Sequence, residues 1–354
     1  MAVLPLLFVP VVTTGNVKPD LEPALMLESS LTMSKRTLDT FFSPPAKKAR
    51  LETITRAISP PPTSTEQSKH ATYPWAVPHL PPHIASEVEL LVTAVGKTID
   101  DQPHLDLLYF QPYIPTSVSR DLFDFLRSEL FFYRVKYNIS RFGKEMQINT
   151  PRFTTVFGLD ETSRFCPSGT IVESTQPSKE VRKDKYKCKP RPIPECLDFL
   201  RRVTEANTNT QYNFCLVNYY ASGSDSISFH SDDERFLGPD PAIASFTLGA
   251  RRDFFMKHKP AKDGEQAVDA KQIKLSLGSG DMVLMRGKTQ SNWLHSIPKR
   301  KGAEADKGRI NITLRRAMVP GGTENYYRYN VGDGEVYKWD KSKKEMLPRA
   351  KSAS

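Results

Sequence analysis

Apolar and polar residues alternate with a period of two over much of the second half of the chain. This period is typical of half-buried β-strands, and Gly-rich turns separate the segments. In the clearest case, Ile310, Ile312 and Leu314 alternate with polar residues. The predicted strands are 213–219, 227–230, 244–248, 253–257, 273–277, 281–285 and 309–317. Many short strands joined by short turns indicate a sandwich or barrel.

Apolar residues recur at helical spacing in two places upstream of these strands. One helix is predicted over 117–130, after Pro115, and a second from Pro194, where Pro is acceptable in the first turn. A short strand is also predicted over 105–110. Both helical stripes are predicted to be core, with no direct chemistry. Their members are Leu122, Phe123, Leu126 and Leu130 in the first helix, and Leu197, Leu200 and Val203 in the second.

The first hundred residues differ in composition from the rest. Between Ser43 and Pro82 the chain is rich in Pro, Ser and Thr, and it buries too little apolar surface to offset the entropy of ordering. We therefore predict a disordered tail over 1–100, a folded domain over 101–320 and a C-terminal extension over 321–354. The apolar run 2–12 lacks a basic flank and is too short to span a bilayer, so no membrane association is predicted. Met33 offers an alternative start.

The chain is basic, with 50 Lys+Arg against 40 Asp+Glu and a net charge of +10. This charge favours polyanionic partners, and a merely solvated basic surface explains it equally well. The cysteines show no C-x-x-C pairing, so neither a zinc knuckle nor a disulfide framework is expected. They are Cys166, Cys188, Cys196 and Cys215.

Three residues are of the types that form iron sites. His230 and Asp232 lie two apart, and His295 follows downstream. Two imidazoles and one carboxylate are the ligands of the facial triad in non-haem Fe(II) oxygenases. A short His-x-Asp pair also arises by chance, and a surface histidine beside acidic neighbours is the alternative.

A second group lies on the predicted strand 309–317. Arg309, Asn311, Thr313 and Arg315 share one face. A solvated outer face is one interpretation. The two guanidinium groups would also suit a small dicarboxylate, because their planar forks match carboxylate oxygens. A 2-oxo dicarboxylic acid is the cosubstrate that such an iron would use.

These motifs together resemble those of AlkB-type Fe(II)/2-oxoglutarate-dependent dioxygenases. The matching segments are His230-Ser-Asp232-Asp-Glu234, Trp293-Leu-His295-Ser-Ile-Pro298 and Arg309-x-Asn311-x-Thr313-x-Arg315, preceded by Asn218-Tyr219-Tyr220. The resemblance covers residues 105–320 and is closest to the nuclear homologues that repair alkylated nucleic acid. It implies a mainly β fold with flanking helices around a double-stranded β-helix, or jelly roll. It also implies Fe(II) at His230, Asp232 and His295, and 2-oxoglutarate at Asn218, Tyr220, Arg309, Asn311, Thr313 and Arg315.

The same resemblance implies an activity. A monomeric enzyme would use Fe(II), 2-oxoglutarate and O2 to demethylate bases such as 1-methyladenine and 3-methylcytosine in DNA, with release of formaldehyde, succinate and CO2. An RNA demethylase on the same scaffold is an alternative that the motifs do not exclude. A non-catalytic adaptor that binds PCNA and nucleic acid is another, which the complete ligand set argues against. Strand preference and lesion range stay open.

Several residues are predicted to meet the substrate. Asp233 and Glu234, beside the iron ligands, would favour the positive charge of such bases, or they only orient the metal site or lie in solvent. Phe142 resembles the wedge of a hairpin that fills the space of a flipped base, or else is core. The remaining expected substrate residues are Gly143, Lys144, Arg152, Arg164 and Phe165.

Two signals lie in the predicted tail. Lys35-Arg36 and Lys47-Lys48-Ala49-Arg50 resemble a bipartite nuclear import signal, so a nuclear location is expected, with a solvated charge run as the alternative. Leu38, Phe41 and Phe42 resemble the box that docks on the sliding clamp PCNA, although Lys35 replaces its usual Gln. The C-terminal aromatics of 324–329 and 336–340 would either contact nucleic acid or pack on the jelly roll.

Overall fold

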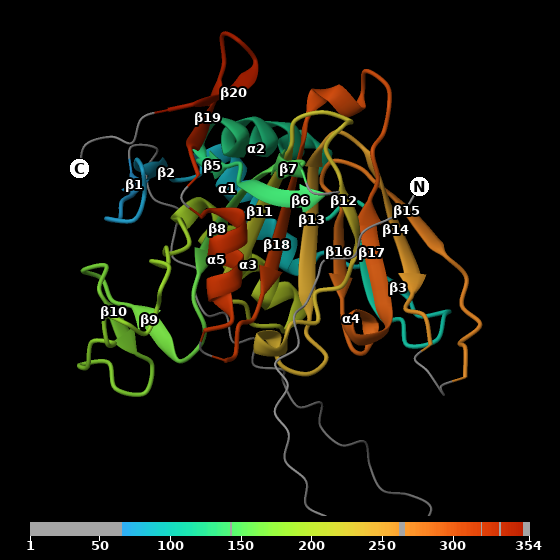
Figure 1. The fold of residues 1–354 in the computed structure, drawn as a ribbon, viewed down its shortest axis with the longest axis horizontal. Coiled ribbons are helices and arrows are strands. Elements are labelled where there is room, and N and C mark those ends of the chain that lie inside the picture. The colour runs from blue at the N-terminus through green and yellow to red at the C-terminus, as the bar shows by residue number, and fades with distance from the viewer. Residues whose placement is uncertain (1–65, 142–143, 262–265, 320, 333, 350–354) are drawn as a thin grey trace, which may run out of the picture. The chain divides into compact units, whose positions relative to one another are not determined.

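The protein is represented by a computed structural model that describes residues 66–141, 144–261, 266–319, 321–332 and 334–349, with only the backbone described over 137–149. In the described residues, a ten-stranded and a four-stranded antiparallel sheet face each other, and three further sheets have two strands each (Figure 1). This is the arrangement of a jelly roll, as predicted. None of the described helices is long and apolar enough to cross a membrane.

The large sheet carries the central strands of the fold. Its order is β20 (Glu345–Pro348), β19 (Val336–Asp340), β5 (Phe132–Tyr133), β8 (Phe153–Gly158), β11 (Phe214–Tyr220), β18 (Arg309–Arg315), β13 (Ile243–Gly249), β16 (Met282–Met285), β4 (Leu107–Phe110) and β3 (Lys97–Ile99). The order of the small sheet is β12 (Ile227–His230), β17 (Trp293–Ile297), β14 (Arg252–His258) and β15 (Ile273–Leu277). The seven strands predicted in the second half are all present, with ends within two residues.

Helices pack against the large sheet and against one another. The described helices are α1 (Pro82–Glu89), η1 (Leu90–Thr93), α2 (Thr116–Glu129), α3 (Glu195–Thr208), η2 (Arg235–Leu237), α4 (Thr289–Asn292), η3 (Ala305–Lys307) and α5 (Thr323–Asn330). The two predicted helices, α2 and α3, are confirmed. Their apolar stripes are buried, including Leu122 and Leu126 in α2 and Leu200 and Val203 in α3.

Ordered structure begins before the predicted domain boundary. Residues 66–100 contain β1 (Gln67–Ser68), β2 (Val77–Pro78), α1 and β3, and β3 pairs with β4. The prediction of a disordered tail is therefore wrong for 66–100. Prolines suggested a tether, but Pro82 starts α1, where a missing N–H is tolerated. Apolar residues reach the core both between the prolines, at Val77 and Leu80, and after Pro82, at Ile84 and Val88 of α1. The predicted import signal and clamp box lie outside the described residues.

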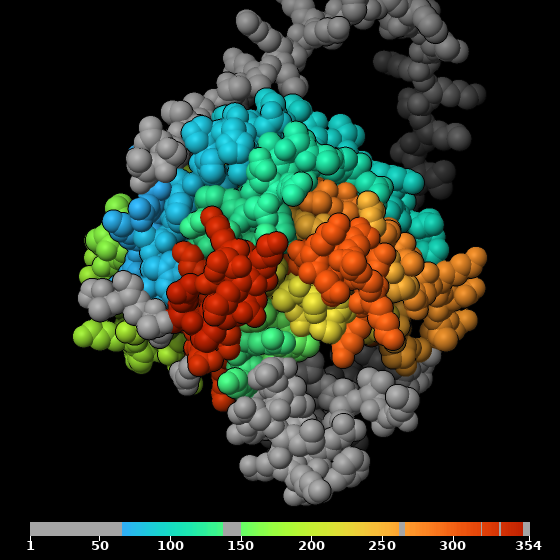
Figure 2. All heavy atoms as spheres, turned by 90° about the horizontal axis from the view of Figure 1, so that it is seen from above, coloured from blue at the N-terminus to red at the C-terminus, as the bar shows by residue number. Residues whose placement is uncertain are grey.

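The C-terminal residues are part of the fold. β19 pairs with β5, β20 pairs with β19, and α5 contacts β8. Figure 2 shows these red residues seated against blue and green ones from much earlier in the chain. Tyr327 and Val336 are buried, and Arg127 of α2 stacks on the Trp339 ring at 4.1 Å. Of the two interpretations of these aromatics, packing on the jelly roll is the one that these contacts support.

Two hairpins project from the sheets. β6 (Lys136–Arg141) and β7 (Lys144–Asn149) pair in register, with Arg141 opposite Lys144. β9 (Ser163–Phe165) pairs with β10 (Ile171–Glu173). Figure 1 shows β9 and β10 on the side of α5 away from β12, whereas β6 and β7 cross in front of the central strands.

Candidate iron centre

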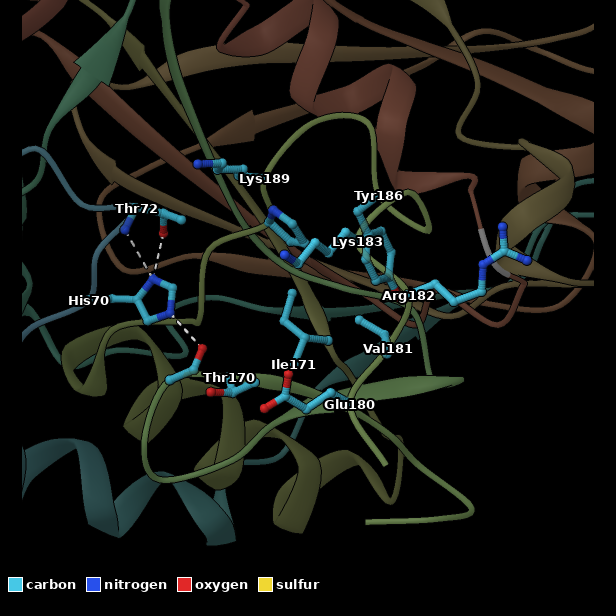
Figure 3. A pocket seen from close by; sticks show the side chains of 12 residues that line it. His70, Thr72, Thr170, Ile171, Glu180, Val181, Arg182, Lys183, Tyr186 and Lys189 are labelled. Carbon is cyan, nitrogen blue, oxygen red and sulfur yellow. Dashed lines mark hydrogen bonds between the residues drawn. The ribbon is translucent and has the colours of Figure 1, made fainter. Parts of the chain in front are cut away.

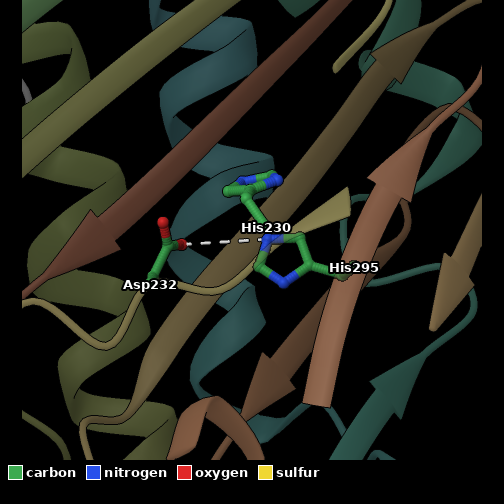
Figure 4. Close-up of side chains that lie close together, drawn as sticks. All are labelled: His230, Asp232 and His295. Atoms are coloured by element: carbon green, nitrogen blue, oxygen red, sulfur yellow. Dashed lines mark ion pairs between the residues drawn. The ribbon is translucent and has the colours of Figure 1, made fainter. Parts of the chain in front are cut away.

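The three predicted iron ligands come together between the two sheets. One donor atom from each of His230, Asp232 and His295 lies within 4.8 Å of the others. The His295 Nε2 is 4.0 Å from the Asp232 carboxylate, and the two imidazole centroids are 4.2 Å apart (Figure 4). Asp232 and His295 are buried, and His230 is half-buried. Among the described residues, no other group of three His, Cys, Asp or Glu residues is so arranged.

Strand pairing sets the positions of the two histidines. His230 ends β12 and lies directly opposite His295 on β17, so both side chains leave the same face of the small sheet. Asp232 follows the strand rather than continuing it. Its backbone N–H donates to Gln290 Oε1 of α4 at 2.9 Å, which anchors the turn. The third ligand therefore reaches the site through a loop, not through strand alternation.

The protonation states suit a divalent metal. Burial lowers the pKa of His230, and it lowers the pKa of His295 to about 3 with the help of the neighbouring His230. Burial raises the pKa of Asp232, but the Arg315 guanidinium and the two histidines outweigh it and hold the pKa below its usual range. Neutral imidazoles and an ionised carboxylate are the forms that bind metal. Ser228 O accepts a bond from His230 Nδ1 at 2.9 Å, which leaves Nε2 as the ligand.

The polar face of β18 is enclosed rather than solvated. Arg309, Asn311, Thr313 and Arg315 are between 1% and 8% exposed. On the neighbouring strand β11, Asn218 pairs with Asn311 and Tyr220 with Arg309, so the predicted 2-oxoglutarate residues share one surface. The interpretation of a water-facing outer surface is therefore wrong for this strand.

Unpartnered donors on this surface fit a dicarboxylate. Arg309 donates to Thr247 Oγ1 at 2.8 Å, but its Nε and Nη1 are buried without a partner among the described residues, as is Arg315 Nε. Burial lowers the pKa of Arg309 to about 10, so the group stays charged at neutral pH. Buried guanidinium nitrogens without acceptors are costly, and a carboxylate ligand would satisfy them. These residues fit bound 2-oxoglutarate.

Arg315 links the iron site to this surface. Its Nη2 donates to Asp232 Oδ2 at 2.8 Å, and its Nη1 donates to Thr313 Oγ1 at 2.8 Å. Arg152, the residue before β8, contacts the 2-oxoglutarate surface in the same way, since its Nε donates to Asn218 Oδ1 at 3.0 Å. The structure thus brings Arg152, predicted as a substrate residue, next to the cosubstrate surface.

The two acidic residues after Asp232 have different surroundings. Asp233 is 47% exposed in its side chain and pairs with Lys259 at 2.5 Å. Glu234 accepts a bond from Tyr326 Oη at 2.7 Å through Oε1, while its Oε2 is buried with no partner in the part of the chain that the structure describes. Burial and the Asp232 carboxylate raise the pKa of Glu234 to about 6. Of the pair, Glu234 is the one turned toward the iron site.

The other predicted substrate residues are not gathered at the triad. Arg164 is exposed on β9, and the Phe165 ring packs edge-on against His70 at 5.3 Å, in a hairpin on the other side of α5 (Figure 1). Lys144 is the first residue of β7. Phe142 and Gly143, which lie between Arg141 and Lys144 in the sequence, fall outside the described residues.

Four functional contacts were not predicted from the sequence. Ser245 accepts a bond from Asn311 at 2.9 Å, and Thr247 accepts one from Arg309. Both are polar positions two apart on β13, so the alternation could have identified them. Gln290 and Tyr326 come from α4 and α5, and no local pattern marks them.

An enclosed His-Asp-His centre beside a surface with two buried arginines, in a jelly roll, is typical of an oxygenase that uses Fe(II) and a 2-oxo acid. Residues 106–315 match the family model of the 2OG-Fe(II) oxygenase superfamily. The chain belongs to this family as an AlkB-type member, and it is an Fe(II)/2-oxoglutarate-dependent dioxygenase.

Similar proteins include DNA oxidative demethylase ALKBH2 of Arabidopsis thaliana, 31% identical over 240 residues, which cover 63% of this chain and 69% of that protein. ALKBH2 of Homo sapiens is 35% identical over 130 residues, 37% of this chain and 49% of that protein. Alpha-ketoglutarate-dependent dioxygenase alkB homolog 3 of Homo sapiens is 37% identical over 117 residues, 33% of this chain and 40% of that protein. The matches thus span half or less of the human relatives.

Proposed function

We propose that this protein removes N-methyl groups from alkylated bases in DNA, such as 1-methyladenine and 3-methylcytosine, with release of formaldehyde, succinate and CO2. The observation that carries the proposal is the Glu234 carboxylate beside the triad, with an unpartnered, buried oxygen. These bases are cationic, and a buried carboxylate attracts a cation far more strongly than a solvated one does. The names of the relatives, DNA oxidative demethylases among them, support the same substrate class.

Each part of the site has a role in this reaction. Bound Fe(II) with 2-oxoglutarate and O2 supplies the oxidant that hydroxylates the N-methyl group. Arg309 binds a carboxylate of the cosubstrate, and Asn218 is oriented for it by Arg152. Arg315 fixes the Asp232 carboxylate so that both oxygens keep their direction. The hydroxymethyl group on the base nitrogen then breaks down to formaldehyde, so no protein nucleophile is needed.

A base must leave its stack to reach the buried triad. The element proposed to assist is the segment that contains β6 and β7, with Phe142, from the sequence between these strands, as the wedge, and with Gly143 and Lys144 next to it in the sequence. An aromatic wedge stabilises an opened stack by replacing the lost base contacts. Arg164 and Phe165 are proposed from the sequence alone: β9 lies on the side of α5 away from β12 (Figure 1), so they would reach the base only if this hairpin moved when substrate binds.

The N-terminal signals add two proposals. Lys35, Arg36, Lys47, Lys48 and Arg50 are proposed to direct nuclear import. Leu38, Phe41 and Phe42 are proposed to bind PCNA, which would bring the enzyme to replicating DNA. Both rest on the sequence motifs alone.

Mass spectrometry of matched oligonucleotides tests the function. The protein is incubated with Fe(II), 2-oxoglutarate and DNA or RNA that carries one 1-methyladenine or 3-methylcytosine. The proposal predicts a product lighter by one CH2 unit from DNA, and none with Asp232→Ala. Conversion of RNA alone would favour the RNA demethylase. Binding without conversion of any substrate would favour the adaptor and overturn the proposal.

A further inference from the structure

Tyr326 reaches the iron site from the C-terminal helix α5. Its hydroxyl donates to Glu234 Oε1 at 2.7 Å and lies 3.5 Å from Asp232 Oδ1. One hydroxyl proton serves one acceptor well, and the shorter distance identifies Glu234. The family match ends at residue 315, so this tyrosine comes from a part of the chain that the family model does not include.

The Tyr326 ring is held on several sides. Its centroid is 5.4 Å from that of Phe214 and 5.6 Å from that of Phe236, both at steep angles. The Arg315 guanidinium lies 5.3 Å from the same centroid. Since Arg315 also binds Asp232, the ring contacts the group that fixes an iron ligand.

Helix α5 is itself fixed to the large sheet. Tyr327 Oη donates to Gly158 O at 2.7 Å, and Asn330 O accepts a bond from Thr154 at 2.5 Å. A group held on a fixed helix positions a partner more precisely than one on a loop.

We propose that Tyr326 is a positioning residue that fixes Glu234 so that its unpartnered oxygen meets the methylated base. The inference rests on the proposed function, because Glu234 is the residue that would recognise the cationic base. Without the hydroxyl, the Glu234 side chain would be free to rotate, and the carboxylate would meet the base in fewer molecules. Iron and 2-oxoglutarate binding are expected to change little, since the hydroxyl makes its short bond to Glu234 and is 3.5 Å from the ligand Asp232, which Arg315 continues to hold.

Tyr326→Phe tests this, because it keeps the packed ring and removes only the hydroxyl. With a single-stranded 1-methyladenine oligonucleotide, kcat/KM is expected to fall about tenfold, the effect of one hydrogen bond to a charged group. The KM for 2-oxoglutarate is expected to stay the same. In a Glu234→Ala background, Tyr326→Phe is expected to add no further loss, because each change alone already removes the Tyr326–Glu234 hydrogen bond. Tyr329→Phe, the same change at an exposed position of α5, is the matched control.

A second measurement does not depend on turnover. Without O2, the protein loaded with Fe(II) and 2-oxoglutarate binds labelled oligonucleotides with or without the methyl group. The preference for the methylated one is expected to fall by the same factor in Tyr326→Phe and Glu234→Ala. Wild-type behaviour of Tyr326→Phe, or losses that add in the double variant, would overturn the proposal. If wild type itself shows neither turnover nor preference, the proposed function fails instead. The coupling between the two residues is then measured from the Tm of Tyr326→Phe, Glu234→Ala and the double variant. Additive shifts in Tm would refute the Tyr326–Glu234 link.

An independent observation concerns the stretch 179–189, here called the basic segment. It contains six cationic and two acidic residues. Arg182 pairs with Asp184, and Lys185 pairs with Glu173. The exposed Lys179, Lys183, Lys187 and Lys189 make no ion pair with any other residue that the structure describes. Arg182, Lys183 and Lys189 border a pocket of about 240 Å³, with His70, Tyr186 and Glu180 (Figure 3).

The basic segment and the iron site flank the same helix. The Cys188 N–H donates to Glu324 of α5 at 2.7 Å, and the Arg191 N–H donates to Tyr327 Oη at 2.8 Å. Glu324 and Tyr326 are two residues apart, so they project from opposite sides of α5. A helix is about 10 Å across, and one DNA strand advances about 3.4 Å per phosphate. Because a strand has to pass around this helix, at least about three nucleotides separate the site from the segment.

We infer that the basic segment binds the phosphates of the nucleic acid strand whose base enters the site. Exposed lysines without partners are the groups that release counterions from a phosphate backbone. Glu180 at the pocket edge would disfavour a free anion there, so the favoured ligand is a strand that spans several lysines.

Salt dependence of binding tests this inference. The variant Lys183→Gln with Lys187→Gln and Lys189→Gln is compared with Lys341→Gln, Lys343→Gln and Lys344→Gln, a matched triplet on the β19–β20 turn. With unmethylated single-stranded DNA of roughly twenty nucleotides, the slope of log Kd against log salt is expected to weaken by about 0.7 per lost contact in the first variant only. Roughly three-nucleotide DNA is expected to show no change. Equal slopes for both variants on the long strand would overturn the inference, whatever the catalytic result.

Discussion

His230 and His295 lie directly opposite each other on the antiparallel strands β12 and β17, with their ring centroids 4.2 Å apart. The strand register therefore brings together two ligands that are 65 residues apart in the sequence. A shift of one residue would turn one imidazole to the other face of the sheet and destroy the pair.

His295→Gln is expected to abolish iron binding, because an amide is a poor replacement for a neutral imidazole on Fe(II). Bound iron per chain is measured after reconstitution and desalting. His258→Gln, on the neighbouring strand β14, is the control and is expected to retain iron. Retention of iron by His295→Gln would show that the metal lies elsewhere.

Asp232→Ala is expected to reduce stability as well as activity. The change leaves the buried Arg315 guanidinium without its anionic partner, and removal of one member of a buried pair costs about 3 kcal/mol or more. Urea denaturation of the metal-free protein measures the free energy of unfolding. Asp253→Ala, which breaks the more exposed pair with Lys274, is expected to cost less than about 1 kcal/mol. Similar losses in the free energy of unfolding for the two variants would contradict a stabilising role of the buried Asp232–Arg315 pair.

Arg309→Lys is expected to raise the KM for 2-oxoglutarate by about tenfold or more, since a lysine cannot reproduce the fork that the unpartnered nitrogens offer. The rate of succinate formation at varied 2-oxoglutarate concentrations measures this KM. Arg316→Lys, which affects the exposed pair with Glu161, serves as the control. An unchanged KM would place the cosubstrate away from β18.

Phe142→Ala is expected to reduce turnover of duplex DNA more than that of single strands, because only a duplex must be opened. Rates are compared on the same lesion in both forms, so each serves as the other's control. Equal losses would assign Phe142 to the fold of the hairpin instead.

Phe41→Ala together with Phe42→Ala is expected to abolish binding to PCNA without change in demethylation of free oligonucleotides. Calorimetry with the purified clamp measures the first effect. Undiminished clamp binding would reject the docking box, and reduced catalysis would show that this segment serves the site itself.

The sequence predicted those features that repeat locally. The alternation in Arg309–Arg315 predicted a strand with one polar face, and the motif around His230 predicted the triad. It did not predict that the polar face is buried, because enclosure depends on the facing sheet. Tyr326 was missed for a similar reason, since its contact with Glu234 joins residues 92 apart.

Composition was the least reliable guide. The composition predicts a disordered tail up to residue 100, yet Ile84 and Val88, just after the proline-rich stretch, are buried. A few apolar side chains at helical spacing, once they are added to a core that the rest of the chain forms, offset the entropy that an isolated segment could not.

The most direct test measures formaldehyde and succinate in the same reaction, with wild-type protein, Fe(II), 2-oxoglutarate and a DNA oligonucleotide that carries 3-methylcytosine. Equal amounts of both products, dependent on the methyl group and absent in Asp232→Ala, are the predicted result. Succinate without formaldehyde on every methylated oligonucleotide would contradict the account, because the iron centre would then act on something other than an N-methyl base.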